Sequence, residues 1–260
     1  MENNAIVIGK GMIGNGLMHS LGITKFFSRS EHNVPYEEIH NFKYIFICLP
    51  TPTRDGKQGL DKIRLYVREI NDRQKGQEKS IIIIHSTILP EMCRRMMKEN
   101  PGSRIAHVPE FLTEETWEKD SEWPDIVVVG AEDGETREEV AGIFRARFKG
   151  AEFFLTDTVT ASTIKYAINC LYALKVIYAN QIFDFCKDKQ VNYETVKAAM
   201  YARAWIGKNH LDIFHKGGRG AGGKCLGKDL DAFANYSNLP LLEYAEKINK
   251  GLILSYPKTK

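Results

Sequence analysis

The chain of 260 residues is long enough for one large domain or for two modest ones, each with its own core. Its 43% apolar and 27% charged composition is ordinary for a globular protein, and a net charge of +3 does not indicate nucleic-acid binding. No signal segment opens the sequence, and its longest apolar runs are too short to cross a bilayer. We therefore expect a soluble, cytoplasmic protein with no nucleic-acid or membrane partner.

In chain order, the first predicted strand, residues 5–8, runs into a glycine turn that opens a helix. Gly9, Gly11 and Gly14 fit the pattern G-x-G-x-x-G in this strand–turn–helix context. Such glycines allow a tight turn and bring backbone N–H groups at a helix N-terminus to a pyrophosphate. We expect this turn, with Met12 and Ile13, to bind a dinucleotide; a chance match in a glycine-containing loop is the alternative.

The second predicted strand, residues 24–28, ends at Ser28, Arg29 and Ser30, without the acidic residue that usually binds a ribose 2′-hydroxyl. An arginine beside hydroxyl groups suits a 2′-phosphate, which would favour NADP. An ordinary loop arginine is an equally good interpretation, so the cofactor is NAD or NADP.

Strands and helices then alternate as far as residue 156. Further strands are predicted at 43–50, 79–86, 103–110, 124–132 and 151–157, and helices at 60–72, 90–100 and 136–148. Alternation of this kind predicts an α/β domain with a parallel, doubly wound, Rossmann-type sheet over residues 1–156.

The pattern of predicted elements changes after residue 157. Helices are predicted at 158–190, 192–207, 228–238 and 239–256, with no convincing strand. Residues 157–260 are therefore predicted to form an all-α domain. Aromatic residues at helical spacing are expected in its core, namely Tyr166, Tyr172, Tyr178 and Phe183.

Ligands of doubly wound sheets bind beyond the carboxyl ends of the strands, so the residues after each strand are candidates. Three such segments, PTPT, STILP and PEFLTE, supply Pro50, Thr51, Thr53, Ser86, Thr87, Glu110, Phe111, Leu112, Thr113 and Glu114. In the helical part, Lys165 and Asn169 are spaced to share one helix face. His85 and His107, at strand ends, are expected to be structural.

The five cysteines are odd in number and widely spaced, which indicates neither disulfides nor a metal site. Cys225 lies in the glycine-rich stretch GGRGAGGKCLGKDL, beside Lys224 and three residues before Lys228, and cationic neighbours favour a nucleophilic thiolate. A buried filler is the alternative for Cys225. The remaining four, Cys48, Cys93, Cys170 and Cys186, are expected to fill core positions.

The segments PTPT, STILP, PEFLTE, IKYAINCLYALK and GAGGKCLGKD, in this order, resemble the nucleotide-sugar 6-dehydrogenases, the family of UDP-glucose and GDP-mannose dehydrogenases. The resemblance extends over nearly the whole chain. It implies oxidation of the C6 alcohol of a sugar nucleotide, with UDP-glucose favoured, to the carboxylate by two NAD(P)+ through a cysteine thioester, as in polysaccharide biosynthesis. The alternatives are a non-catalytic dinucleotide-binding remnant or half of a split enzyme, and a hydroxyacid dehydrogenase.

The resemblance also implies residue roles. Cys225 matches the nucleophile, while Lys165 and Asn169 match residues that hold the substrate oxygen. Asp229 with Thr87 matches a pair that orders a water, and Glu114 matches the carboxylate for thioester hydrolysis. The other matches are Glu110, Gly220, Gly222 and Gly223 for the substrate and Lys228 for the cofactor.

Each polar candidate also has an ordinary explanation. Lys165 and Asn169 suit an exposed helix surface, and Glu110 and Glu114 suit a solvated loop. Asp229 suits a helix N-cap.

The sequence departs from the family pattern at several points. Lys224 and Gly227 replace small residues or proline, Trp205 stands where many members have an arginine, and Ser162 replaces a glutamate. The family's third domain, which binds the nucleotide part of the substrate, is expected to be missing or supplied by a separate chain. An apolar stripe over residues 239–253 predicts a homodimer.

Overall fold

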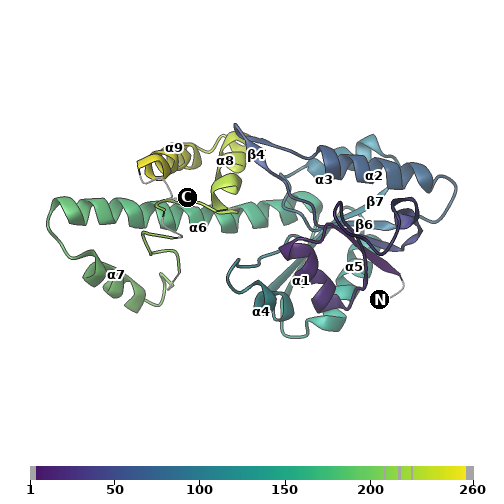
Figure 1. The fold of residues 1–260 in the computed structure, drawn as a ribbon, viewed down its shortest axis with the longest axis horizontal. Helices are drawn as coiled ribbons and strands as arrows, with labels where there is room; N and C mark the ends of the chain where they lie inside the picture. Colours follow the sequence, from purple (N-terminus) through teal and green to yellow (C-terminus); the bar gives the residue numbers. More distant parts are fainter. Residues whose placement is uncertain (1–3, 208, 216–217, 224, 256–260) are drawn as a thin grey trace. The chain divides into compact units, whose positions relative to one another are not determined.

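The computed structural model describes residues 4–207, 209–215, 218–223 and 225–255. The chain divides into two compact units. Unit 1 comprises Met1–Thr51 and Gly59–Lys165, and unit 2 comprises Pro52–Gln58 and Tyr166–Lys260. The colours of Figure 1 follow the sequence through both units. The domain boundary predicted after residue 156 stays a prediction.

Unit 1 contains a seven-stranded sheet with the strand order β2-β1-β3-β6-β7-β8-β9. The strands are β1 (Ala5–Ile8), β2 (Lys25–Phe27), β3 (Tyr44–Ile47), β6 (Ile81–Ile84), β7 (Arg104–His107), β8 (Ile126–Ala131) and β9 (Glu152–Thr156). The helices are α1 (Met12–Leu21), the 3₁₀ turn η1 (Tyr36–Asn41), α2 (Asp61–Arg73), α3 (Met92–Glu99), α4 (Trp117–Glu122) and α5 (Gly134–Arg147). The predicted Rossmann-type α/β class is confirmed.

The central strands are apolar throughout because helices cover both faces of the sheet. Successive strand residues point to opposite faces, so Val7 and Phe46 pack with α1 and α5, whereas Ile6 and Ile45 pack with α2 and α3. Figure 1 shows α2 and α3 on one side of the strands and α1 and α5 on the other. The register aligns Val7 with Phe46 and Phe46 with Ile83.

The prediction of a parallel sheet is correct for the first five strands in spatial order but wrong at the next pair. β8 pairs antiparallel with β7, with Ala106 opposite Ala131, and β9 is parallel to β8. The connection from β7 to β8 carries only the short α4, which packs on α1. Since hydrophobic periodicity does not encode strand direction, the sequence left this reversal undetermined.

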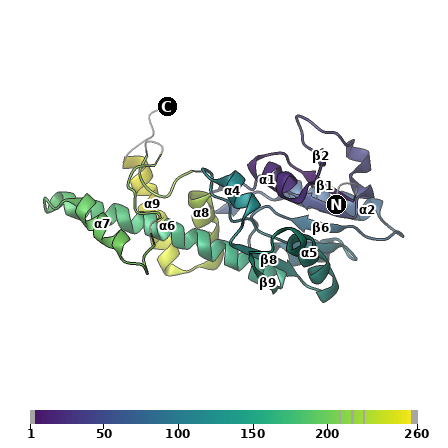
Figure 2. The same ribbon diagram turned by 90° about the horizontal axis from the view of Figure 1, so that it is seen from below.

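Unit 2 is mainly helical, with α6 (Thr158–Asp188), α7 (Tyr193–Ala202), α8 (Leu226–Ser237) and α9 (Pro240–Ser255). The first residues of α6 belong to unit 1. Figure 2 shows these helices from a second direction. The four predicted helices therefore form; α6, α7 and α9 are shorter than predicted, and α8 begins two residues earlier.

A β-hairpin, which the sequence analysis did not predict, also belongs to unit 2. It consists of β4 (Thr53–Arg54) and β5 (Lys57–Gln58), joined through Asp55 and Gly56, which both have positive φ. An Asp-Gly pair is a strong hairpin signal, so this element was predictable in principle. Gly56 N–H donates to Asp231 Oδ2 over 3.1 Å, and Asn235 Nδ2 donates to Gly56 O over 3.1 Å, which docks the hairpin on α8.

The aromatic residues predicted for the helical core differ in their burial. Tyr166 is fully buried and its ring stacks on Phe233 with 5.0 Å between centroids. Phe183 is half-buried. The prediction is wrong for Tyr172 and Tyr178, which are 38% and 55% exposed, because the 31-residue α6 buries only part of its circumference.

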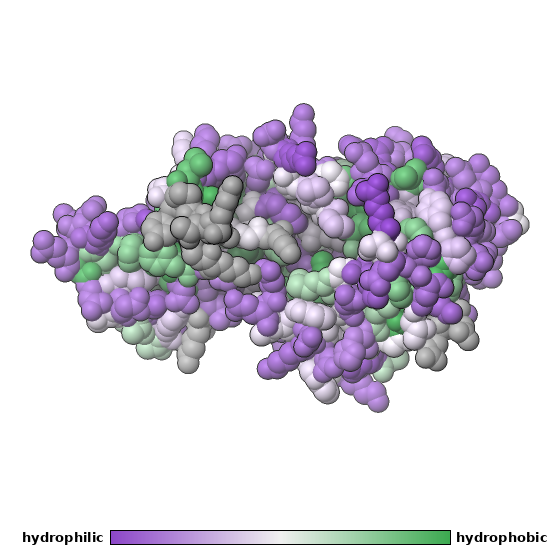
Figure 3. Space-filling view, viewed as in Figure 1, coloured by the Kyte–Doolittle hydropathy of each residue, from purple (hydrophilic) through white to green (hydrophobic). Residues whose placement is uncertain are grey.

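The apolar stripe of α9 is also only partly buried. Leu242, Ala245 and Leu252 are buried, while Leu239, Leu241 and Ile253 are exposed. Figure 3 shows mostly hydrophilic side chains on the face in view, with scattered apolar ones. The predicted homodimer stays a prediction. Among the described residues, every helix is too short or too polar to span a membrane.

Candidate active site

The glycine turn between β1 and α1 forms as predicted. Gly9 has a φ of 102°, and a Cβ there would lie 2.5 Å from Cys48 O. A Cβ on Gly14 would lie 1.9 Å from Gly9 O, so both positions require glycine. Gly11 is the N-cap of α1, and a Cβ there would meet nothing within 4 Å. The backbone of the turn is therefore fixed by Gly9 and Gly14, while Gly11 leaves open space at the N-terminus of α1, where Met12 and Ile13 begin the helix.

The segment after β2 holds a charged pair that the sequence analysis missed. Ser28 Oγ donates to Glu31 O over 2.7 Å, and Arg29 is exposed. Lys10, in the glycine turn, binds Glu31 Oε2 at 3.0 Å. Glu31 is thus the first acidic side chain after β2, and it directly follows residues 28–30, where the sequence showed no acidic residue.

The segments after β3 and β6 are joined by their polar groups. Thr51 Oγ1 donates to the backbone oxygen of Thr87 over 2.8 Å, and Ser86 Oγ donates to Ile47 O over 3.2 Å. Thr51, Ser86 and Thr87 are buried, whereas Pro50 is exposed. Because β3 and β6 are parallel, these predicted residues do lie at one edge of the sheet.

Glu110 and Lys165 form a buried ion pair within unit 1. Lys165 Nζ lies 3.3 Å from Glu110 Oε1, and the two side chains are 4% and 6% exposed. Glu110 Oε2 accepts a hydrogen bond of 2.6 Å from the backbone of Leu112, and Lys165 Nζ lies 5.2 Å from the centroid of the Phe111 ring. The interpretations of Lys165 as an exposed helix lysine and of Glu110 as a solvated carboxylate are therefore wrong.

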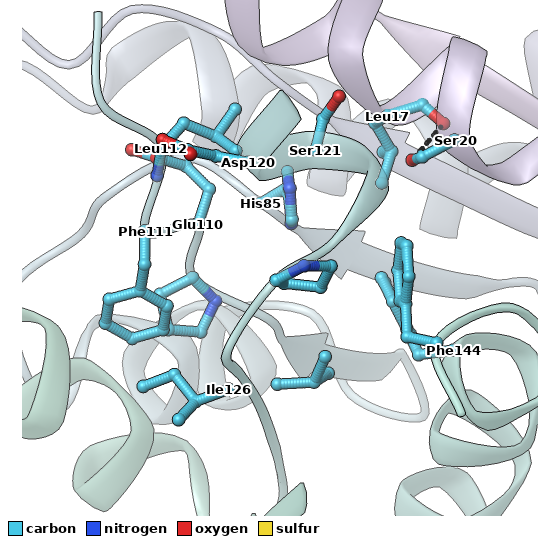
Figure 4. Close-up of a pocket in the computed structure, with 14 residues that line it drawn as sticks. Leu17, Ser20, His85, Glu110, Phe111, Leu112, Asp120, Ser121, Ile126 and Phe144 are labelled. Atoms are coloured by element: carbon cyan, nitrogen blue, oxygen red, sulfur yellow. Dashed lines mark hydrogen bonds between the residues drawn. The ribbon is translucent and has the colours of Figure 1, made fainter. Parts of the chain in front are cut away.

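A small cavity of about 60 Å3 lies beside this pair in unit 1. Figure 4 shows His85, Glu110 and Ser121 among its lining residues. His85 Nδ1 has no hydrogen-bond partner among the described residues. Burial lowers the pKa of His85 to about 4, although the charge of Glu110 acts in the opposite direction.

Asn169 and Asp229 form a second buried cluster, within unit 2. Asn169 Nδ2 donates to Asp229 Oδ2 over 2.6 Å, and Lys228 Nζ contacts Asp229 Oδ1. Asp229 is 1% exposed and Asn169 is 6% exposed. The interpretation of Asn169 as a surface amide is wrong, and so is that of Asp229 as an N-cap, because Cys225 is the N-cap of α8.

Cys225 is half-buried and precedes the first residue of α8. Of the glycines before it, Gly220 and Gly223 have positive φ, and Gly222 is half-buried. Lys224, whose charge was expected to act on the thiol, lies outside the described residues. Glu114 and Thr113 are exposed on the segment after β7, and Thr113 N–H donates to Asp120 Oδ2.

The other four cysteines occupy buried positions, as predicted, and His107 is buried as well. Cys48, Cys93, Cys170 and Cys186 are all buried. Burial, together with the charge of Asp229, raises the pKa of Cys170 to about 12. His107 is fully buried, its Nδ1 lies 2.9 Å from Ile84 O, and burial lowers its pKa to about 4.

Comparison with protein families identifies both parts of the chain. Residues 23–148 match the NAD binding domain of the UDP-glucose/GDP-mannose dehydrogenase family, and residues 159–251 match the central domain of that family. The chain belongs to the UDP-glucose/GDP-mannose dehydrogenase family.

Curated relatives agree with this family. The chain is 31% identical over 210 residues to the UDP-glucose 6-dehydrogenase of Rickettsia felis, which covers 78% of this chain and 45% of that protein. It is 28% identical over 263 residues to UDP-glucose 6-dehydrogenase AglM of Haloferax volcanii, which covers 92% of this chain and 60% of that protein. The chain thus spans about half the length of the curated relatives that it matches.

Solved structures show the same fold. A UDP-glucose dehydrogenase from Pyrobaculum islandicum has a TM-score of 0.80 at 20% identity, covering 96% of this chain and 68% of that one. A 3-hydroxyisobutyrate dehydrogenase from Mycobacterium tuberculosis has a TM-score of 0.72 at 15% identity, covering 100% of this chain and 97% of that one. Because both enzymes share the fold, the fold alone does not select the substrate.

The residues of unit 1 fit the NAD(P) cofactor of this family. Gly11, the N-cap of α1, faces open space, and a helix N-terminus of this kind is where a diphosphate is bound. Glu31 and Arg29 follow β2, where a ribose or its 2′-phosphate is read in such folds.

Proposed function

We propose that this chain carries the oxidation chemistry of the nucleotide-sugar 6-dehydrogenases. The C6 alcohol of a sugar nucleotide, with UDP-glucose favoured, is oxidised to the carboxylate with two NAD(P)+ through a thioester on Cys225. The observation that carries the proposal is the buried cluster of Asn169, Asp229 and Lys228 in the unit that also contains Cys225. Burying a carboxylate costs free energy even when it is paired, so Asp229 is a candidate for a functional role.

Lys165 and Asn169 hold the substrate oxygen. They lie four residues apart in α6, and neither side chain is more than 6% exposed. An ammonium and an amide N–H fixed in a dry environment stabilise the negative charge that develops when an alcohol loses its proton. Glu110 orients the Lys165 side chain through the 3.3 Å contact between them.

Asp229 accepts the proton of the alcohol through a water that Thr87 helps to order. The contacts with Asn169 and Lys228 hold the Asp229 carboxylate in a fixed orientation, as a general base requires. NAD(P)+, when bound, accepts a hydride in each of the two oxidations. Gly9, Gly11, Gly14 and Ser28 hold it, with Met12, Ile13, Arg29, Pro50, Thr51, Thr53, Ser86, Thr87, Glu114 and Lys228 as further contacts.

Cys225 captures the intermediate aldehyde. Its sulfur bonds to C6 while the aldehyde oxygen takes a proton, which gives a thiohemiacetal, and the second oxidation converts this adduct to a thioester. A water, deprotonated by Glu114, then attacks C6, the C–S bond breaks, and the thiol and the carboxylate are released. Substrate contacts come from Glu110, Phe111, Leu112, Thr113, Gly220, Gly222 and Gly223.

The test is turnover by the purified chain with UDP-glucose and NAD+ or NADP+, alone and with a separately supplied C-terminal domain of the family. Two reduced nicotinamides are expected for each uronate formed. If no sugar nucleotide in a broad panel gives reduced cofactor under either condition, the proposal is wrong. Cofactor-dependent thermal stabilisation without turnover would instead favour a non-catalytic dinucleotide-binding protein.

A further inference from the structure

Asn249, on α9, binds the glycine-rich loop before Cys225 with both ends of its side-chain amide. Its Oδ1 accepts from Ala221 N–H at 2.7 Å, and its Nδ2 donates to Ala221 O at 3.0 Å. Asn249 is 4% exposed and Ala221 is 1% exposed. This buried pair of hydrogen bonds therefore satisfies the loop backbone where it is removed from water.

The loop passes close to α9 at this point. Gly220 has a φ of 77°, and a Cβ there would lie 2.8 Å from Asn249 Oδ1 and 3.2 Å from the Cβ of Leu252. Glycine is needed at this position for both conformation and space. The glycine content of the loop is thus explained at Gly220 by contact with α9.

Ala221 also touches the beginning of α8. A Cβ on Gly227 would lie 2.8 Å from Ala221 O, the same oxygen that accepts the bond from Asn249. Gly227 is in the first turn of α8, two residues after Cys225. The Ala221 peptide therefore lies between α9 and the turn that positions the thiol.

Arg219 provides a second anchor for the same loop. Its Nε donates to Asn180 Oδ1 over 2.9 Å, and its Nη2 lies 2.9 Å from Asp184 Oδ1, both on α6. The loop is thus attached to α6 at Arg219 and to α9 at Ala221 before it reaches Cys225.

We propose that Asn249 is a positioning residue for Cys225. It clamps Ala221 against the first turn of α8 and so fixes the thiol at the N-terminus of that helix. The positive end of a helix dipole favours a thiolate, but only when the sulfur is held within the first turn. The catalytic importance of this role rests on the proposed function, whereas the effect on the thiol does not.

The experiment uses the whole chain and the rate at which iodoacetamide alkylates Cys225, read from peptide masses over a pH series. Asn249→Ala removes both bonds, and Asn249→Asp keeps the volume but places a second oxygen against Ala221 O. Both variants should raise the pH midpoint of Cys225 alkylation by roughly half a unit, the size of a helix-terminus effect. Exchange of the Ala221 amide should also rise about tenfold or more when its bonds are lost.

Asn100→Ala is the matched control, because Asn100 is an equally buried asparagine of unit 1 that bonds Met96 O over 2.8 Å. It should lower stability and leave the Cys225 midpoint unchanged. A midpoint that is the same in wild type and both Asn249 variants, or a wild-type midpoint no lower than that of an ordinary cysteine, overturns the proposal. Since alkylation needs no turnover, an inactive chain would refute the proposed function without affecting this result.

Discussion

Asn169 Nδ2 donates a 2.6 Å hydrogen bond to Asp229 Oδ2, which joins residues 60 positions apart within unit 2. Both side chains are buried, so the carboxylate depends on Asn169 and Lys228 in place of water. The pair links the long helix α6 to α8, whose N-cap is Cys225.

Asn169→Ala should lower the free energy of unfolding by about 1–3 kcal/mol, because it leaves a buried carboxylate oxygen without its partner. Urea denaturation measures the loss. Asn192→Ala is the control, since Asn192 caps α7 at an exposed site, and its loss should cost about 1 kcal/mol without touching the cluster. Equal stability of Asn169→Ala and wild type would show that water replaces the amide and that Asp229 is not enclosed.

The two glycines of the α1 turn should separate folding from cofactor binding. Gly14→Ala would place a Cβ 1.9 Å from Gly9 O and should prevent normal folding, whereas Gly11→Ala meets nothing in the chain. Gly11→Ala should therefore keep the melting temperature of the wild type and weaken NAD(P)+ at least about tenfold by obstructing the approach of the diphosphate. Circular dichroism measures the melting temperature, and calorimetric titration measures the affinity for NAD(P)+. An unchanged NAD(P)+ affinity in Gly11→Ala would place the cofactor elsewhere.

Arg29→Ala tests cofactor choice. If Arg29 meets a 2′-phosphate, its loss should weaken NADP+ roughly ten- to a hundredfold, the size of one charge-assisted contact, and leave NAD+ unchanged. Titration of both cofactors measures the ratio. Lys25→Ala, at the other end of β2, is a matched loss of positive charge. If the two variants give the same ratio of NADP+ to NAD+ affinity as wild type, Arg29 is an ordinary loop arginine.

Acid should destabilise unit 1 through its buried histidines. Burial lowers the pKa of His85 to about 4, while in the unfolded chain it returns to its usual value of about 6.5. Below about 6.5 the unfolded state binds the extra proton, so stability that is complete above that pH is lost as the pH falls towards 4. The loss is of the order of 3 kcal/mol for His85 alone.

Urea unfolding across this range, for wild type and His85→Gln, measures that contribution. The variant should lose less stability than the wild type between pH 6.5 and 4, and His32→Gln, at an exposed site, should lose as much as the wild type. If the free energy of unfolding changes equally with pH in wild type and His85→Gln, His85 takes up a proton as readily in the folded chain as in the unfolded chain.

The sequence predicted the Rossmann-type class because buried strands and amphipathic helices alternate in it, and it placed the site residues at strand ends because parallel strands share an edge. It did not predict the reversal of β8, since hydrophobic periodicity does not encode strand direction. Nor did it distinguish buried from exposed polar residues. The buried partner of Lys165 is Glu110, which is 55 residues away, and the buried partner of Asn249 is Ala221, which is 28 residues away.

The hairpin at residues 53–58 was missed for a different reason. Its strands have two residues each, too few for a periodic pattern, and they are stabilised by bonds to α8 that join residues more than 170 positions apart. Glu31 was not predicted because the acidic residue was expected within residues 28–30, and Glu31 is the next residue along the chain.

The central claim is that Cys225 bonds covalently to the substrate, and the rate of uronate formation by Cys225→Ala tests it most directly. The measurement compares wild type, Cys225→Ala and Cys186→Ala, which removes a buried thiol of the same unit. Wild type and Cys186→Ala should form uronate, Cys225→Ala should form none, and Glu114→Gln should accumulate a thioester visible in the intact mass. If Cys225→Ala forms uronate as fast as the wild type, Cys225 is not the nucleophile and the proposed mechanism is wrong.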